Sequence, residues 1–183
     1  MIETPDSEET TGSDTLSICF VCTGNICRSP LADVVLGRMA RETSLSDGSF
    51  LADHIRISSA GTGPWHAGEP MDPRAVAVLG EHGYTDHGHI ARQFAVSWFD
   101  EEDLIVCLAR RHQQTLRSLA VGRPMDGRLV LLRSYDRGAG GAVDVPDPYY
   151  GDAADFEECL TLIEAGCRGL VLELVSRLED DQV

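Results

Sequence analysis

The sequence contains no lysine, so each of its 15 basic side chains is an arginine. These arginines stand against 30 acidic side chains, which gives the 183-residue chain a formal net charge of −15. Proteins that bind nucleic acid need clustered cations against the phosphate backbone. The charge balance therefore argues against a nucleic-acid-binding protein.

Long hydrophobic runs are also missing. The longest, Leu104 to Ala109, is far shorter than the roughly 20 residues of a membrane-spanning helix. Residues 1–14 hold no basic segment followed by an apolar one, as a secretory signal would. We expect no membrane association, a cytoplasmic location and, in that setting, reduced cysteines.

The length predicts one domain, because domains average roughly 150 residues. Five acidic and no basic residues lie in residues 1–14, which we expect to be a disordered tail. Residues 179–183 are also acidic and are expected to form a C-terminal tail. The folded domain should then span residues 15–178.

Strand-like and helix-like segments alternate along that domain. Strands are predicted at 16–21, 55–59, 104–108 and 129–132, and helices at 29–43, 73–83, 115–119 and 155–178. Ser29-Pro30 and Asp72-Pro73 each pair a helix-capping residue with a proline suited to the first helical position. This order predicts an α/β fold, a single doubly wound domain whose four-stranded parallel sheet has helices on both faces.

The loop from Cys22 to Arg28 follows the first strand and precedes the first helix. Backbone N–H groups around Gly24, the helix N-terminus and the Arg28 guanidinium can converge on phosphate oxygens there. The same positive field favours the thiolate form of Cys22, which is the nucleophilic form. The loop therefore predicts a phosphate site with a nucleophile.

A phosphoryl-transfer site also needs an acid for the leaving oxygen. Asp147, in Asp147-Pro148-Tyr149-Tyr150, lies in a long loop of glycine, proline and aspartate and is the best candidate. The chemistry requires no cofactor, and His87-Gly88-His89 lacks the acidic or thiol partner at helical spacing that a metal site would need. The remaining cysteines at 19, 107, 159 and 167 are expected to be buried small apolar residues.

The segment from Val21 to Pro30, together with Asp147 to Gly151, resembles the low-molecular-weight protein tyrosine phosphatase family. Further similar segments begin at Ser58, Asp72 and His89 and follow in the family's order. The resemblance covers about residues 15–178. It implies a phosphatase acting on tyrosine-phosphorylated proteins, a tyrosine kinase among the candidates. We also expect a monomer.

The resemblance also implies individual roles. Cys22 would form a cysteinyl-phosphate, Arg28 would clamp the phosphate, and Asp147 would act as general acid and then as base. Ser29 would donate a hydrogen bond to the Cys22 sulfur, and Ser59 and His89 would support the strained loop. The phosphate-binding and substrate-binding residues would be Thr23, Gly24, Asn25, Ile26, Cys27, Ser29, Trp65, Tyr149 and Tyr150.

Two of these positions suggest regulation and specificity. Cys27 matches a second loop thiol that can form a disulfide with Cys22 under oxidation, although a small buried loop residue fits the position equally well. Trp65 would face Tyr149 and Tyr150 across a deep aromatic slot. Such a slot suits a phosphotyrosine ring and leaves phosphoserine too short to reach Cys22.

Three alternatives stay open on the sequence. An arsenate reductase would need relay cysteines after the second helix, yet residues 83–103 contain none. A protein arginine phosphatase would carry threonine at the position of Ile26 and lack the paired tyrosines. A redox or phosphate-binding module without turnover would use Cys22 and Cys27 and would not need Asp147.

Overall fold

The computed structural model describes residues 15–180, and both predicted tail segments lie wholly or partly outside that range. The elements in chain order are β1 (Leu16–Cys22), α1 (Arg28–Glu42), β2 (Ile55–Gly61), α2 (Pro73–Glu81), α3 (Trp98–Glu101), β3 (Leu104–Cys107), α4 (Arg110–Leu119), β4 (Leu129–Leu131) and α5 (Ala153–Asp180). Two 3-10 turns, Leu51–Asp53 and Leu132–Ser134, join them.

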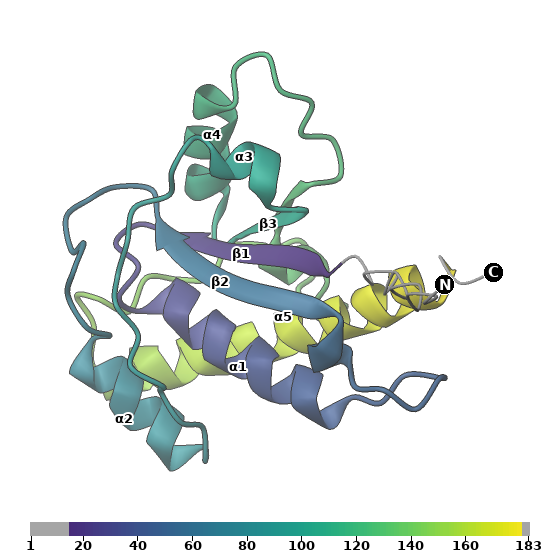
Figure 1. Ribbon diagram of the computed structural model, residues 1–183. Coiled ribbons are helices and arrows are strands. Elements are labelled where there is room, and N and C mark those ends of the chain that lie inside the picture. Colours follow the sequence, from purple (N-terminus) through teal and green to yellow (C-terminus); the bar gives the residue numbers. More distant parts are fainter. Residues whose placement is uncertain (1–14, 181–183) are drawn as a thin grey trace, which may run out of the picture.

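The strands form one parallel sheet in the order β2-β1-β3-β4. Helices α1, α2 and α5 cover one face, and α3 and α4 lie on the other (Figure 1). Parallel strands need crossover connections, which bring the helices onto both faces. The predicted four-stranded, doubly wound α/β fold is confirmed.

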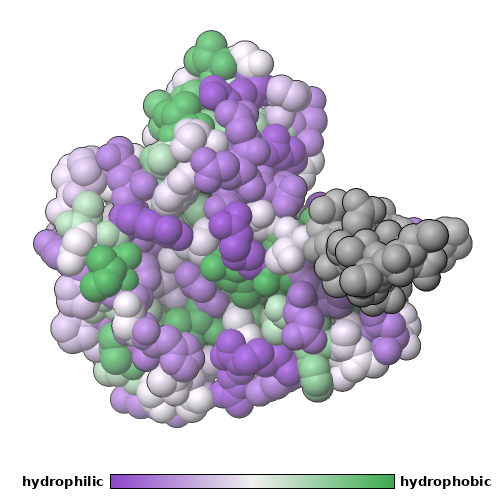
Figure 2. Space-filling view, in the orientation of Figure 1, coloured by the Kyte–Doolittle hydropathy of each residue, from purple (hydrophilic) through white to green (hydrophobic). Residues whose placement is uncertain are grey.

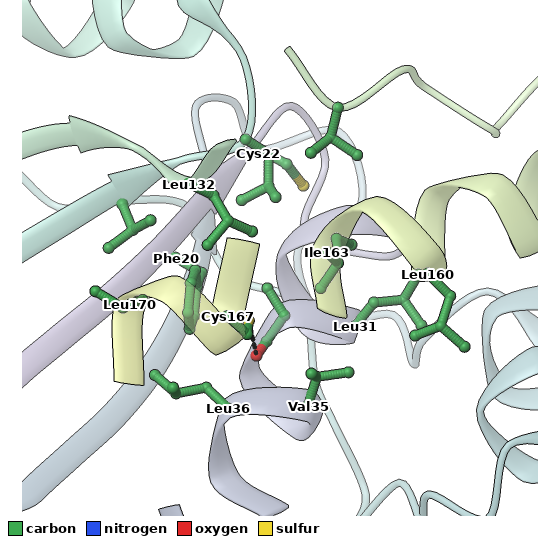
Figure 3. Close-up of a cluster of buried hydrophobic side chains, with 14 of the residues drawn as sticks. Phe20, Cys22, Leu31, Val35, Leu36, Leu132, Leu160, Ile163, Cys167 and Leu170 are labelled. Atoms are coloured by element: carbon green, nitrogen blue, oxygen red, sulfur yellow. Dashed lines mark hydrogen bonds between the residues drawn. The ribbon is translucent and has the colours of Figure 1, made fainter. Parts of the chain in front are cut away.

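Side chains alternate across β1 and supply both halves of the core. Ile18, Phe20 and Cys22 point into the cluster under α1 and α5, whereas Cys19 and Val21 point into the smaller cluster under α3 and α4. Figure 3 shows the larger cluster, with Cys22 at its upper edge. The nucleophile candidate is therefore held at the end of a strand that is buried from Ser17 onward.

The sheet order has a reversal point at β1. The chain leaves β1 for its neighbour β2 on one side, and β3 then pairs with β1 on the other side. In open α/β sheets, ligands bind outside the carboxyl ends of the strands where the order reverses. The loop that starts at Cys22 lies at this point.

Several predicted boundaries were wrong. Helix α1 starts at Arg28, and Ser29 does not cap it, because no side-chain cap bond is made there. Helix α4 starts at Arg110 instead of residue 115, and the short helix α3 was missed. Helix α5 continues past residue 178 to Asp180, so the C-terminal acidic segment begins in the helix.

Other local predictions were right. The Asp72 side chain accepts the backbone N–H of Arg74, two residues on, and so caps α2. Beyond the helix end, Gly83 has a φ of 74°, a left-handed conformation that favours glycine. Cys19, Cys107, Cys159 and Cys167 are all buried, as expected.

No helix within residues 15–180 is long and apolar enough to span a bilayer. Figure 2 shows one face of the molecule covered mostly by hydrophilic residues, with hydrophobic ones in small, separate patches.

Packing of α5 depends on two glycines that face the turn after β4. A Cβ at Gly166 would lie 2.6 Å from Leu132 Cγ, and one at Gly169 would collide with the Tyr135 carbonyl. We predict that Gly169→Ala lowers the free energy of unfolding by about 2 kcal/mol, because overpacking forces the backbones apart. Urea unfolding followed by circular dichroism measures this.

Gly80 is the matched control, since it is also helical but has open space where a Cβ would be added. Gly80→Ala should raise the free energy of unfolding by about 0.5–1 kcal/mol through helix propensity. Equal effects of the two substitutions would contradict the packing argument.

Candidate active site

A cavity of about 380 Å³ opens at the carboxyl end of β1. Its lining residues come from the loop after β1, the segment after β2, and the loop before α5: Cys22, Thr23, Gly24, Ile26, Cys27, Arg28, Trp65, His66, Asp147, Tyr149 and Tyr150. The structure thus brings together residues more than a hundred positions apart in the sequence.

Asn25 is the chain's single asparagine and shapes the loop. Its φ of 60° is left-handed, the one such value among non-glycine residues 15–180. Four hydrogen bonds hold it: the backbone N–H of Asn25 points to Cys22 Sγ, His89 Nε2 donates to the Asn25 carbonyl, the Arg92 backbone N–H donates to Oδ1, and Nδ2 donates to Ser29 Oγ. The surroundings therefore enforce the strained conformation.

The Cys22 thiol is 2% exposed and lies among hydrogen-bond donors. The Asn25 N–H is 3.3 Å from Sγ, and Ser29 Oγ is 3.0 Å from it. Ser29 Oγ is also 3.2 Å from the Ala60 carbonyl, so its single hydrogen has two acceptors to choose between. A Cys22 thiolate is a stronger acceptor than the Ala60 carbonyl, so the Ser29 hydroxyl would donate its hydrogen to the sulfur.

Gly61 lets the end of β2 approach the loop. It pairs with Cys22 in the sheet register, and a Cβ added there would lie 2.6 Å from the Thr23 carbonyl oxygen. The Thr62 and Gly63 N–H groups donate to the carbonyls of Cys22 and Thr23. Any larger residue at position 61 would push the loop out of place.

Arg28 lies at the first position of α1 and is 1% exposed. Its Nη1 donates to the Val145 carbonyl, and its Nη2 donates to Thr23 Oγ1 and Asp147 Oδ2. The Nε atom is buried without a hydrogen-bond partner. Because an unpaired buried donor costs free energy, this N–H is suited to an anion entering the cavity.

Asp147 reaches the cavity from the loop before α5 and is about one-third exposed. Its Oδ2 lies 2.5 Å from Arg28 Nη2 and 2.9 Å from Arg111 Nη2. Its other oxygen accepts the Tyr149 N–H at 3.4 Å. The carboxyl group therefore lies at the mouth, between two guanidinium groups.

His112 supports the loop from α4. Its Nε2 lies 3.0 Å from Thr23 Oγ1, and its Nδ1 is buried without a partner. Burial, with further contributions from Arg28 and Arg111, lowers the pKa of His112 to about 3. The imidazole is therefore neutral near neutral pH and can accept the Thr23 hydroxyl hydrogen.

Aromatic side chains surround the mouth. Tyr149 contacts both His66 and Tyr150, with ring centroids 5.7 and 4.9 Å apart. Trp65 and Tyr150 are 67% and 95% exposed, so both have most of their surface available to a ligand. The thiol thus lies below a wall of aromatic rings.

Ser59 and Cys27 were expected to support the loop and to act in redox regulation. The Ser59 carbonyl accepts a hydrogen bond from Arg92 Nε, so Ser59 contacts the segment that holds the Asn25 side chain. Cys27 is buried, and that burial raises the pKa of its thiol. It is a protonated thiol at neutral pH.

Sequence reasoning missed His66, Arg92, Arg111 and His112. Arg111 and His112 directly follow a predicted strand next to β1, and the carboxyl ends of parallel strands meet at one edge of the sheet. That position could have flagged both. His66 and Arg92 lie in segments without regular periodicity, and nothing in the sequence singles them out.

The fold and the site can now be compared with known proteins. The low molecular weight phosphotyrosine protein phosphatase family model matches residues 17–182. The chain belongs to that family. It is thereby a phosphoric monoester hydrolase, as the cysteine- and arginine-lined cavity already suggested.

Individual phosphatases of this family are similar over nearly their whole length. A low molecular weight protein-tyrosine-phosphatase of Streptomyces coelicolor is 47% identical over 166 residues, 90% of this chain and 97% of that one. Low molecular weight protein-tyrosine phosphatase A of Mycobacterium tuberculosis is 46% identical over 160 residues, 86% and 91% of the two chains.

Solved phosphatase structures share the fold. YfkJ from Bacillus subtilis has a TM-score of 0.78 at 33% identity, covering 89% of this chain and 96% of that one. A protein tyrosine phosphatase from Entamoeba histolytica, with Hepes in its active site, has a TM-score of 0.76 at 26% identity, covering 92% and 100%.

The neutral state of His112 predicts how stability of this phosphatase depends on pH. The pKa of His112 is lower in the folded than in the unfolded chain, so the unfolded chain binds the proton more readily below pH ~6.5. The contribution of neutral His112 to stability is fully present above that value and is lost as pH falls toward 3. Between pH 7 and 5, the free energy of unfolding should therefore fall by about 2 kcal/mol more in wild type than in His112→Gln.

Urea titrations at both pH values, on both proteins, measure the difference. All carboxylates are common to the two proteins, so their contribution cancels. An identical pH dependence of wild type and His112→Gln would show that His112 binds its proton equally in the folded and unfolded chains.

Proposed function

We propose that this phosphatase hydrolyses phosphotyrosine in proteins through a cysteinyl-phosphate on Cys22. The observation that carries the proposal is the buried, unpartnered Nε of Arg28 in the same cavity as the Cys22 thiol. A phosphate oxygen would supply the acceptor that this donor lacks. The similarity to protein-tyrosine phosphatases of Streptomyces coelicolor and Mycobacterium tuberculosis supports the tyrosine assignment.

In the first step, the Cys22 thiolate attacks phosphorus, an S–P bond forms and the P–O bond to the tyrosine breaks. Arg28 and the N–H groups at the start of α1, which no side chain caps, stabilise the equatorial oxygens. Asp147 gives its proton to the leaving phenolate oxygen.

In the second step, water attacks phosphorus and the S–P bond breaks. The Asp147 carboxylate takes a proton from that water, phosphate leaves and the Cys22 thiolate is restored. Ser29 Oγ, 3.0 Å from Sγ, donates a hydrogen bond to the departing sulfur. Asp147 thus returns to its protonated form and the cycle closes.

The depth of the cavity and its aromatic walls favour phosphotyrosine over phosphoserine. Cys22 is buried at the bottom of the cavity, and Tyr149, Tyr150 and Trp65 surround its mouth. A phenyl ring spans that depth and stacks on the walls. A phosphoserine side chain would place its phosphate short of the thiol.

We predict that Cys22→Ser lowers the rate of phosphate release from a phosphotyrosine peptide by at least about a thousandfold, because the nucleophile is lost. Asp147→Asn should lower kcat by about 100- to 1000-fold, because the leaving phenolate goes unprotonated. Steady-state assays near pH 6 under reducing conditions measure both. Near-normal turnover by Cys22→Ser would contradict the mechanism.

Phosphoserine peptide and phosphoarginine protein, assayed in parallel, test the substrate class. Little release from either is expected beside fast release from phosphotyrosine. A preference for phosphoarginine would show that Ile26 and the paired tyrosines do not set specificity, and absence of release from every substrate would favour a binding or redox module.

We further propose that oxidation switches the enzyme off reversibly. Peroxide oxidises the Cys22 thiolate to a sulfenic acid and is itself reduced to water; the Cys27 thiol then attacks that sulfur, releasing water and forming a disulfide. Both cysteines line the one cavity, which supports the pairing.

After peroxide treatment and then dithiothreitol, wild type should regain most of its activity, whereas Cys27→Ser should regain several-fold less because its Cys22 oxidises further. Peptide mapping by mass spectrometry identifies the disulfide. Full recovery of Cys27→Ser would show that Cys27 does not protect the nucleophile.

A further inference from the structure

Arg111 is not part of the phosphate loop and does not line the cavity, but it contacts Asp147, which does. It is the second residue of α4, and its Nη2 donates to Asp147 Oδ2 at 2.9 Å. Arg28 Nη2 donates to the same oxygen. The general acid candidate therefore has two arginine partners.

The proposed mechanism gives these two arginines different roles. The proposed mechanism needs Arg28 to grip phosphate, and a bidentate grip uses two N–H groups on one edge of the guanidinium, such as Nε and Nη2. Nη2 already serves Thr23 and Asp147. Once it turns to phosphate, its bond to Asp147 is weakened or lost.

Arg111 can hold Asp147 after Arg28 has turned to the phosphate. Its side chain is 56% exposed at the rim, so it can keep its bond to Asp147 without competing for the buried phosphate site. Its bond engages only Oδ2, which leaves Oδ1 and its Tyr149 N–H contact undisturbed.

The neighbouring histidine fixes the direction of Arg111. Arg111 Nε donates to His112 Nε2 at 3.3 Å, and His112 is 2% exposed and held by Thr23. Because His112 is neutral near neutral pH, its Nε2 accepts the Arg111 N–H, sharing its lone pair between this donor and the Thr23 hydroxyl, and the ring does not repel the guanidinium. The Arg111 side chain is thus anchored at Nε and presents Nη2 to Asp147.

We propose that Arg111 is a positioning residue that keeps Asp147 over the cavity while Arg28 holds the phosphate. This inference rests on the proposed function, since it assumes that Asp147 protonates the leaving oxygen. Its effect should therefore depend on how much the leaving group needs that proton.

The test compares a phosphotyrosine peptide with dinitrophenyl phosphate, whose leaving group departs with little protonation. In single-turnover measurements, which isolate the first step from the later attack of water, Arg111→Ala should release the dephosphorylated tyrosine peptide about tenfold more slowly than wild type, because the acid is less often in place. The substrate concentration that gives half the maximal rate should change less than about twofold, and the release of dinitrophenolate should slow equally little. Arg111→Lys should restore part of the lost rate.

Arg117→Ala is the matched control. Arg117 is exposed on the same helix, six residues on and so about 9 Å along its axis, and its removal changes the net charge equally. Arg117→Ala should show wild-type rates for both substrates. Undiminished single-turnover release of dinitrophenolate by Arg111→Ala shows in addition that the variant folds.

The double variant Arg111→Ala/Asp147→Asn separates the possible failures. If Arg111 acts through Asp147, it should be no slower than Asp147→Asn alone. A further tenfold loss in the double variant, a raised half-saturating substrate concentration with an unchanged single-turnover rate, or a wild-type single-turnover rate for Arg111→Ala would overturn the inference while leaving the proposed function intact. If Asp147→Asn alone were fully active, the acid assignment in the proposed function would itself fail.

Discussion

The hydrogen bond from His89 to the Asn25 carbonyl, 2.7 Å long, is the interaction on which the site depends. It holds a non-glycine residue at a φ of 60°, and the loop conformation that results turns the Asn25 N–H toward the Cys22 sulfur. Without that turn, neither the thiol nor the Arg28 donors would face one cavity. The segment around Arg92 packs against β2 and adds to this restraint, because the Arg92 backbone N–H donates to the Asn25 side chain.

The site also resolves an apparent conflict in charge. A chain with a net charge of −15 binds a phosphate dianion only if cations are concentrated where it binds. Arg28, at 1% exposure, is desolvated by the core and paired with Asp147. His112, whose pKa is lowered by burial and by both arginines, is neutral near neutral pH and adds no further positive charge. The positive charge concentrated at the site therefore outweighs the negative net charge of the whole chain for a phosphate bound there.

Much of the fold could be predicted because the strands are buried on both faces and appear as continuous apolar runs. Cys22, Arg28 and Asp147 could be found because a strand, a glycine loop and a helix start frame the first two, and a proline-rich loop carries the third. Ser29 was predicted as a helix cap because serine before proline usually is one, but tertiary contacts with Cys22, Asn25 and Ala60 use its hydroxyl instead. Arg111 was missed because α4 begins in a segment without apolar periodicity, and the one sequence signal for it is its place shortly after a strand next to β1.

The central claim is that phosphate passes through Cys22. Rapid acid quenching during turnover of a phosphotyrosine peptide, followed by phosphorus NMR and mass spectrometry, tests it most directly. The account predicts phosphate bound to sulfur on the peptide that contains Cys22, and none in Cys22→Ser. Phosphate on another residue, or full turnover with no phosphorylated cysteine in either protein, would contradict it.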